Sequence, residues 1–202
     1  MLVIACGALA RELMAVIRAS GWDHLAVQCL PAELHNRPEK ITDAVRAKIA
    51  AARGRFASIF VAYGDCGTGG ALDRMLAQES VERIAGAHCY EFLAGAHAFE
   101  RLCDEEPGTF YLTDFLLRHF DRLVIRGLGL DRYPHLASQY FGNYRRLVYL
   151  AQQPGAERTF AAQAAADRLG LAFEQRETGL GGLKRALARG VLVNEERIAW
   201  AG

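Results

Sequence analysis

The chain contains no long hydrophobic run, and this absence sets the first limit on what the protein can be. None of the apolar stretches in its 202 residues approaches the roughly 20 residues that a transmembrane helix needs. Near the N-terminus, Arg11 and Glu12 interrupt the apolar pattern and no basic segment precedes it, so we expect no signal peptide. We therefore expect a cytoplasmic protein that does not enter a membrane.

The sequence also lacks a substantial net charge of either sign. Its formal charge is +1 at neutral pH, so the composition gives no electrostatic reason to expect binding to nucleic acid or to an acidic membrane surface. Hydrophobic residues make up 51% of the chain and charged residues 23%, which is typical of a globular protein. The length allows one domain of ordinary size or two small lobes, with a buried core.

Several motifs with well-defined chemistry are missing. The chain has no Gly-x-Ser-x-Gly segment, which argues against Ser/His/Asp hydrolysis. The glycine-rich loop 64–70 lacks both the lysine of a phosphate-binding P-loop and the spacing of a dinucleotide-binding fingerprint. No two cysteines stand in a Cys-x-x-Cys spacing, so the usual zinc motifs are absent as well.

What the sequence does have is an alternation of short apolar runs with amphipathic helical patterns. The runs that we expect to form strands are 2–6, 25–29, 58–62, 83–89, 146–150 and 171–175. The patterns that we expect to form helices between them are 8–19, 36–52, 70–78, 156–169 and 181–188. Such repeated β-α-β units predict an α/β fold with a Rossmann-like, mostly parallel sheet and helices on both faces.

The middle of the chain interrupts this alternation. Residues 101–144 contain a short extended piece, a helix and an aromatic-rich stretch, so we expect a mostly helical central insert. We predict a single α/β domain over residues 1–202. The alternative is two lobes, residues 1–100 and 145–202, joined by that insert. Residues 191–200 give no clear pattern.

The five cysteines carry the sharpest signal in the sequence. They are Cys6, Cys29, Cys66, Cys89 and Cys103. An odd number in a reducing compartment argues against a disulfide framework, and a lone free cysteine is more often a small buried hydrophobe than a functional group. Four of these cysteines, however, end or closely follow an expected strand. In a parallel sheet they would share the edge where ligands bind. Cys29 ranks lower because Leu30-Pro31 follows it instead of a glycine turn, and Cys103 because it lies beside Asp104-Glu105-Glu106, which is typical of a peripheral thiol.

This convergence predicts a cysteine-lined metal site at the carboxyl ends of the strands. The thiolates of Cys6, Cys66 and Cys89 can hold Zn²⁺ with His88 or an open fourth position. They can equally hold an iron–sulfur cluster with one iron left free for a substrate. Adjacent residues on a strand face opposite sides, so His88 and Cys89 both ligate only if the strand has already ended.

Glycines follow two of these cysteines. Gly7, Gly67, Gly69 and Gly70 are our candidates for binding a cofactor or small ligand, because glycine allows positive φ and a close approach of the backbone. Backbone N–H groups at the start of a helix also favour an anion. The alternative is that a strand–helix turn simply needs glycine at these positions.

Two carboxylates are candidates for a general acid or base. Glu91 and Asp114 both lie near expected helix starts. The alternative for each is a helix cap, since a carboxylate is favourable at the positive end of a helix. His97, His119 and His135 show no spacing typical of metal ligands.

Four motifs together resemble a known family. They are Cys6-Gly7-Ala8-Leu9 with Glu12, Tyr63-Gly64-x-Cys66-Gly67, Gly86-x-His88-Cys89-Tyr90-Glu91 with Gly95, and Pro107-Gly108-Thr109-Phe110-x-Leu112-Thr113-Asp114. The set resembles the bacterial and archaeal family catalogued as domain of unknown function 1638, over nearly the whole chain. Members of that family tend to accompany corrinoid-dependent methyltransferases, so the resemblance implies a role in one-carbon metabolism. The chain itself has no Asp-x-His-x-x-Gly corrinoid-binding motif.

Three functional hypotheses follow. The first is a metal-binding protein, with zinc or an iron–sulfur cluster, acting in or beside corrinoid-dependent methyl transfer. The second is a non-enzymatic accessory protein that docks on a corrinoid methyltransferase through its Tyr- and Arg-rich middle. The third is a domain that binds a small molecule or phosphate ligand, in which the cysteines only pack. Whether the protein is an enzyme stays open at this stage.

Overall fold

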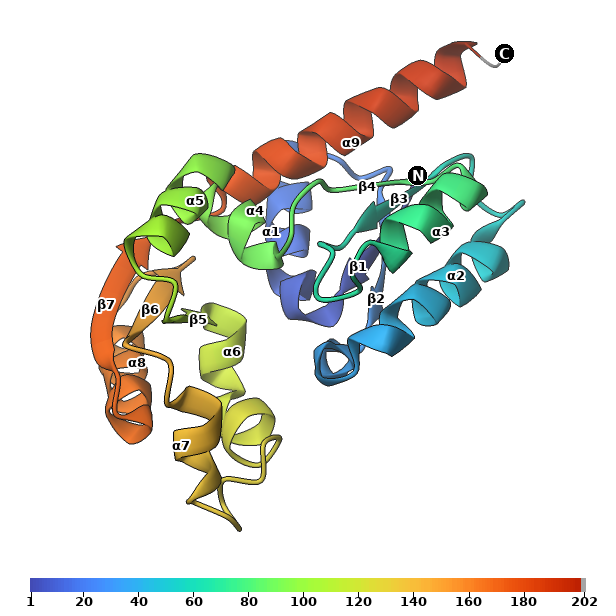
Figure 1. The fold of residues 1–202 in the computed structure, drawn as a ribbon. Coiled ribbons are helices and arrows are strands. Elements are labelled where there is room, and N and C mark those ends of the chain that lie inside the picture. The colour runs from blue at the N-terminus through green and yellow to red at the C-terminus, as the bar shows by residue number, and fades with distance from the viewer. Residues whose placement is uncertain (201–202) are drawn as a thin grey trace. The chain divides into compact units, whose positions relative to one another are not determined.

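The chain forms two compact units in a computed structural model that describes residues 1–200, with the side chains of residues 1–192. The first unit consists of residues 1–92 together with the chain from residue 180 onward, and the second consists of residues 93–179 (Figure 1). Each unit has its own parallel sheet, so the predicted α/β fold with a Rossmann-like arrangement is confirmed.

The sheet of the first unit contains four parallel strands. These are β1 (Leu2–Cys6), β2 (Ala26–Leu30), β3 (Ile59–Ala62) and β4 (Glu82–Arg83), in the order β2-β1-β3-β4. The α-helices of this part are α1 (Ala10–Ser20), α2 (Ile41–Ala52), α3 (Ala71–Glu79), α4 (Cys89–Ala94) and α9 (Gly181–Trp200). Short 3-10 helices η1 (Gly7–Leu9), η2 (Ala32–Asn36) and η3 (Pro38–Lys40) connect them.

Both faces of this first sheet are covered, which explains why all five residues of β1 are buried. Alternate side chains of a strand point to opposite faces. Leu2, Ile4 and Cys6 pack in one core with apolar side chains of α2 and α3. On the opposite face, α9 contacts both α1 and β3. The continuous apolar run of β1 is therefore the pattern of a parallel strand buried on both sides.

A glycine in α9 lets this helix lie close to β3. A Cβ atom added to Gly190 would overlap the ring of Phe60, which is buried in β3. The packing of α9 against the first sheet therefore requires a residue without a side chain at position 190.

We expect Gly190→Ala to destabilise the protein by about 1–3 kcal/mol, because overpacking outweighs the better helix propensity of alanine. Urea unfolding of the full chain measures this change. Gly181→Ala is the matched control in the same helix, since a Cβ there meets only the end of the Arg185 side chain at 3.4 Å. A Gly190→Ala protein as stable as the parent chain would contradict the expectation.

The second unit is a smaller three-stranded parallel sheet. Its strands are β5 (Thr109–Thr113), β6 (Arg146–Ala151) and β7 (Ala172–Glu177), in the order β5-β6-β7. Its helices are α5 (Ala96–Glu105), α6 (Asp114–Arg118), the π-helix Asp121–Ile125, α7 (Leu136–Phe141) and α8 (Ala156–Leu169). Leu112, Leu147 and Tyr149 form its core with small residues of α8.

The boundaries of the units differ from those expected. Residues 101–144 are mostly helical, as expected, but their extended piece is β5, whose ladder with β6 makes it an edge strand of the second sheet. The expected lobe 145–202 is divided as well, because α9 packs on the first unit. Residues 191–200, which gave no clear pattern, continue α9.

The expected strand 83–89 is also much shorter than predicted. β4 ends at Arg83, and Cys89 is the first residue of α4. Arg83 itself donates through Nη1 to the carbonyl oxygens of Ile84 and Gly86, at 2.7 and 3.0 Å. These bonds hold the chain in a loop after β4, where the carbonyl oxygen of Gly86 also accepts from the N–H of Asp65 at 3.1 Å.

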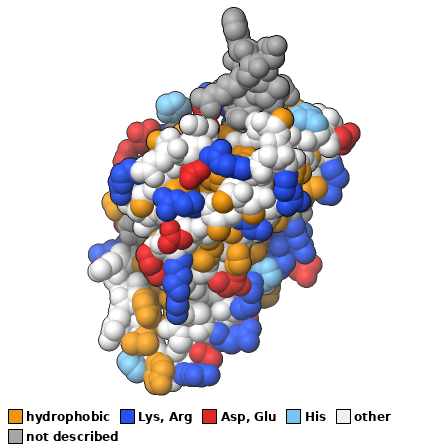
Figure 2. Space-filling view, turned by 90° about the vertical axis from the view of Figure 1, so that its right-hand side faces the viewer, with side chains coloured by type: hydrophobic (Ala, Val, Ile, Leu, Met, Phe, Trp, Pro, Cys, Tyr) orange, Lys and Arg blue, Asp and Glu red, His pale blue; other side chains and the backbone are white. Residues whose placement is uncertain are grey.

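The surface gives two further observations. Among residues 1–200, no helix combines the length and the apolar character needed to cross a membrane. On the face shown in Figure 2, Lys and Arg side chains lie among Asp and Glu side chains, with hydrophobic groups between them.

Candidate functional site

The topology of the first unit places its candidate site at the ends of β1 and β3. The chain passes from β1 to β2 on one side and later enters β3 on the other side of β1. Such a reversal of strand order is the point where open α/β sheets bind ligands, beyond the carboxyl ends of the strands. Cys6 ends β1, and Tyr63 directly follows β3.

Cys6 is buried, with its sulfur at the start of η1. The backbone N–H of Ala8 donates to Cys6 Sγ at 3.3 Å, so the thiol caps this short helix. Burial raises the pKa of the Cys6 thiol, while the bond from Ala8 and the nearby Tyr63 hydroxyl partly offset that rise. The neighbouring Gly7 has a packing reason, because a Cβ there would lie 2.9 Å from the carbonyl oxygen of Leu30.

Cys66 is held in an unusual backbone conformation within the loop that follows β3. Its φ is +49°, in the left-handed region that costs a residue with a side chain about 1–2 kcal/mol. Its N–H donates to the carbonyl oxygen of Ala87 at 2.8 Å, which joins this loop to the one after β4. A glycine would adopt this conformation freely. Here the loop carries a buried thiol instead.

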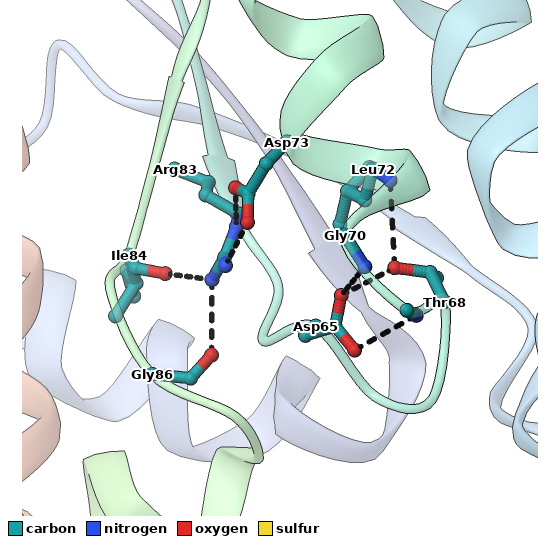
Figure 3. A network of polar contacts seen from close by, with 9 residues as sticks. Asp65, Thr68, Gly70, Leu72, Asp73, Arg83, Ile84 and Gly86 are labelled. Carbon is teal, nitrogen blue, oxygen red and sulfur yellow. Dashed lines mark hydrogen bonds and ion pairs between the residues drawn. The ribbon is translucent and has the colours of Figure 1, made fainter.

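The rest of this loop is organised by Asp65 (Figure 3). Its carboxylate accepts hydrogen bonds from Thr68 Oγ1 at 2.6 Å and from the N–H groups of Gly69 and Gly70 at 3.2 and 2.9 Å. The Thr68 bond and the two backbone bonds lower the pKa of Asp65. The amides of Gly69 and Gly70, predicted to bind a ligand, thus already have an acceptor. A phosphate at this loop would have to displace Asp65.

Arg83 fixes the neighbouring loop against α3 (Figure 3). Its guanidinium binds the carboxylate of Asp73 through two bonds, at 2.5 and 2.8 Å. The same side chain donates to Ile84 and Gly86. One arginine therefore positions residues 84–89, which carry the remaining cysteine of the site.

Cys89 begins α4, and its thiol lies near the other two. Burial raises its pKa well above the ordinary value, and charge interactions with Cys66 and Cys6 raise it further. His88, beside it, is exposed. Partial burial lowers the pKa of its imidazole, as does the nearby His35. Since β4 has ended at Arg83, the objection that adjacent strand residues face opposite sides does not apply to His88 and Cys89.

His35 belongs to the same site, although no motif in the sequence marks it as a candidate. Its Nδ1 lies 3.9 Å from Cys6 Sγ and 3.0 Å from the carbonyl oxygen of Ala32, and its ring stacks on Tyr63 with centroids 5.7 Å apart. Burial alone would lower the pKa of His35, but the hydrogen bond and charge interaction with Cys66 raise it above the ordinary value. One feature of the sequence could have indicated His35: it lies a few residues after β2, and therefore at the same edge of the sheet as the cysteines.

The Tyr63 hydroxyl lies among these sulfurs. The residue is completely buried. Its oxygen has no partner at strict hydrogen-bond geometry among the described residues, and its nearest polar interaction is a looser hydrogen bond with the Cys6 thiol. Burial raises the pKa of this phenol, and the nearby Cys6, Cys66 and Cys89 raise it further. The Cys6 thiol is therefore the partner of this buried hydroxyl.

Charge interactions link Cys89 to Cys6 and Cys66, and link all three to Tyr63; we call these three cysteines the thiol cluster. His88 lies at its edge. In the described residues, no three His, Cys, Asp or Glu side chains already stand in the arrangement of a metal site. Any metal would therefore have to draw the three sulfurs inward.

The other candidate residues have local structural partners. The carboxylate of Glu91 accepts from the N–H of Ala87 at 3.0 Å and so holds the loop before α4. Cys29 lies on β2, where burial and then the nearby Cys6 raise the pKa of its thiol. Cys103 belongs to the second unit, with Sγ 3.5 Å from the Tyr111 hydroxyl.

Asp114, the second candidate acid or base, lies in the second unit and is buried. Its carboxylate accepts hydrogen bonds from the Tyr149 hydroxyl at 2.7 Å and from the N–H groups of Gln152 and Gln153 at 3.2 and 3.0 Å. These bonds tie the start of α6 to the end of β6. The arrangement fully accounts for a buried carboxylate at this position.

Fold and site together define an α/β protein with a Rossmann-like first unit and a thiol cluster at its topological switch point. Residues 29–187 match the family described as Protein of unknown function (DUF1638). The chain belongs to this family, and the match extends through both units. No curated protein and no solved structure gives a significant match.

Proposed function

We propose that the protein binds a thiophilic metal, Zn²⁺ or an iron–sulfur cluster, through the thiolates of Cys6, Cys66 and Cys89. What supports the proposal is that three thiols from three separate segments are near enough to interact with one another and with the buried Tyr63 hydroxyl through their charges. Cysteines that merely pack have no reason to meet at the ligand-binding edge of a sheet. The strained backbone of Cys66 also favours a functional role for this residue, because strained conformations are found mostly at functional sites.

The ligand set of this proposal is three thiolates with a fourth position that is not a cysteine. Nδ1 of His35 must donate to the Ala32 carbonyl, which can only accept, so His35 could ligate only through Nε2. His88, exposed at the edge, is the alternative fourth ligand. A metal with an open position acts as a Lewis acid or activates a bound thiol for methyl transfer. A place in or beside corrinoid-dependent methyl transfer is the context that the family suggests.

Metal analysis of the full chain tests this function. The protein is purified without oxygen, its metal content is measured, and the apo form is titrated with Zn²⁺ and Fe²⁺/sulfide in turn. One zinc ion or one cluster per chain is the expected result. Substoichiometric metal after purification, together with no uptake on titration, would remove the proposal.

Metal uptake is expected to strengthen as the pH rises. The metal binds thiolates, so it releases a proton from each thiol that was protonated beforehand. Burial raises the pKa of the Cys6 thiol and, more strongly, that of the Cys89 thiol, so each must give up a proton to bind a metal. Zinc affinity, measured by competition with a chelator, should increase from about pH 6 to about pH 9 without levelling at the pKa of a free thiol, about 8.5. Affinity independent of pH would show that these thiols are not ligands.

A second candidate function is docking on a corrinoid methyltransferase component as an accessory protein. Two tyrosines of the second unit favour it, since Tyr133 is 55% exposed and Tyr140 48% exposed, and tyrosine is enriched at protein interfaces. Co-purification with the corrinoid component tests this candidate. Binding that survives Tyr133→Ser and Tyr140→Ser together would place the interface elsewhere, and no co-purification would dismiss it.

The third candidate, a phosphate or other small ligand, has one observation in its favour. A cavity of about 410 Å³ in the first unit is lined by side chains that include Thr68, Arg46 and Arg74. A thermal-shift screen separates this candidate from the first. Stabilisation by phosphate compounds but not by metal would favour it, and the reverse result would favour the thiol cluster.

A further inference from the structure

The second unit has a cavity of its own at the carboxyl ends of β6 and β7. Its volume is about 340 Å³, within the range of roughly 300–1,000 Å³ that small-molecule sites occupy. One side is formed by α5 and the end of α4, and the other by Leu150 of β6 and by the end of β7. All of its lining residues belong to the second unit. The cavity therefore lies at the edge where parallel sheets bind their ligands.

Much of the lining of this cavity is apolar. Leu102 and Leu150 are buried. Ala94 and Ala98, on the helical side, leave space in front of them because their side chains are short. Ligand sites typically combine such a lining with a small number of polar groups that orient the ligand. An apolar group of a ligand therefore has a place here.

Charged side chains complete the lining, and two of them already have ion-pair partners. Arg176, near the end of β7, binds the carboxylate of Glu174. Glu105, at the end of α5, lies with its carboxylate 3.6 Å from a guanidinium nitrogen of Arg146. The charges of Arg176 and Glu105 are thus compensated within the protein.

The two other charged groups of the lining are Arg101 on α5 and Glu177 at the end of β7. Among the side chains that the structure describes, neither has an ion-pair partner. They carry opposite charges and come from different elements. A purely anionic ligand would leave Glu177 uncompensated beside it, and a purely cationic ligand would do the same to Arg101.

We propose that this cavity binds a small zwitterion of the amino acid class, whose carboxylate pairs with Arg101 and whose ammonium group pairs with Glu177. A guanidinium group can bind a carboxylate through two parallel hydrogen bonds. The apolar side chain of the ligand then lies against Leu102 and Leu150. This site is separate from the thiol cluster and requires no metal.

The first measurement is a thermal-shift screen of the full chain with the standard amino acids. At least one amino acid with an apolar side chain is expected to stabilise the protein. Calorimetry then compares this amino acid with two analogues. Its amide keeps only the ammonium group, and its deaminated acid keeps only the carboxylate. Each analogue should bind about tenfold more weakly or worse, because it lacks one charge-assisted interaction.

Two variants assign the charges to their residues. Arg101→Gln should weaken binding of the amino acid about tenfold and leave binding of the amide nearly unchanged. Glu177→Gln should weaken binding of the amino acid to a similar degree and spare the deaminated acid. Arg132→Gln is the control, since Arg132 is exposed in the same unit and does not line the cavity. It should bind all three compounds as the parent chain does, and circular dichroism confirms the fold of each variant.

Each other outcome counts against the proposal. The absence of stabilisation by any amino acid overturns it. An analogue that binds as tightly as its parent amino acid also overturns it, because one of the two charges would then have no role. Equal affinity for the amino acid in the parent chain, Arg101→Gln and Glu177→Gln places the binding elsewhere. Metal content enters none of these measurements, so their results are independent of the proposed metal site.

Discussion

Cys66→Ser is expected to abolish stoichiometric metal binding. Loss of a residue that only supports a metal ligand typically lowers metal affinity 10–100-fold, so loss of a thiolate ligand should lower it by roughly 100-fold or more. Of the three cysteines, Cys66 gives the clearest test, because its replacement by serine changes little besides the sulfur atom. Its backbone lies at φ +49°, and serine preserves both this conformation and nearly the same volume.

The comparison needs cysteines from inside and outside the thiol cluster. Cys6→Ser and Cys89→Ser should give the same loss as Cys66→Ser. Cys103→Ser, in the second unit, should keep full metal content, and Cys29→Ser, on β2, is the closer control. Metal content and zinc affinity are measured for each full-length variant, with circular dichroism to confirm the fold. Full metal binding by Cys66→Ser would show that this sulfur is not a ligand.

Asp114→Ala is expected to cost about 3–5 kcal/mol of folding free energy. The change leaves the Tyr149 hydroxyl and the N–H groups of Gln152 and Gln153 without their acceptor. Each buried donor that loses its acceptor lowers the free energy of unfolding by about 1–3 kcal/mol. Urea unfolding of the full chain, followed by circular dichroism, measures the loss.

Two further variants separate structure from chemistry at this position. Tyr149→Phe removes only one of the three bonds and should cost about 1 kcal/mol. Asp104→Ala, at an exposed position of the same unit, should be nearly neutral. Metal content should stay unchanged in all three proteins. A loss of less than about 1 kcal/mol for Asp114→Ala would return Asp114 to the candidates for an acid or base.

The general plan of the fold follows from local patterns. The apolar run of β1 is long enough for a strand and buried on both faces, and the stripe of α1 ends at a glycine in the left-handed conformation, Gly21. Parallel order follows from the helices between the strands. From these features, the sequence predicts that Cys6 and Cys66 come to one edge.

Other features depend on contacts between distant segments. β4 is two residues long, because Arg83 reaches Asp73 and two carbonyl groups in a way that no local pattern reveals. The same holds for α9, whose return to the first sheet depends on the fit of Gly190 against Phe60. His35 has no motif around it and reaches the site only because η2 folds back over the end of β1.

The sequence by itself determined the kinds of element, the parallel order of the strands and the placing of three thiols beyond strand ends, because periodicity and glycine turns are local properties. Only the tertiary structure decided which side chains surround those thiols and which carboxylates already have partners. Burial and hydrogen bonding are sums over residues far apart in the chain, and a linear pattern does not contain them.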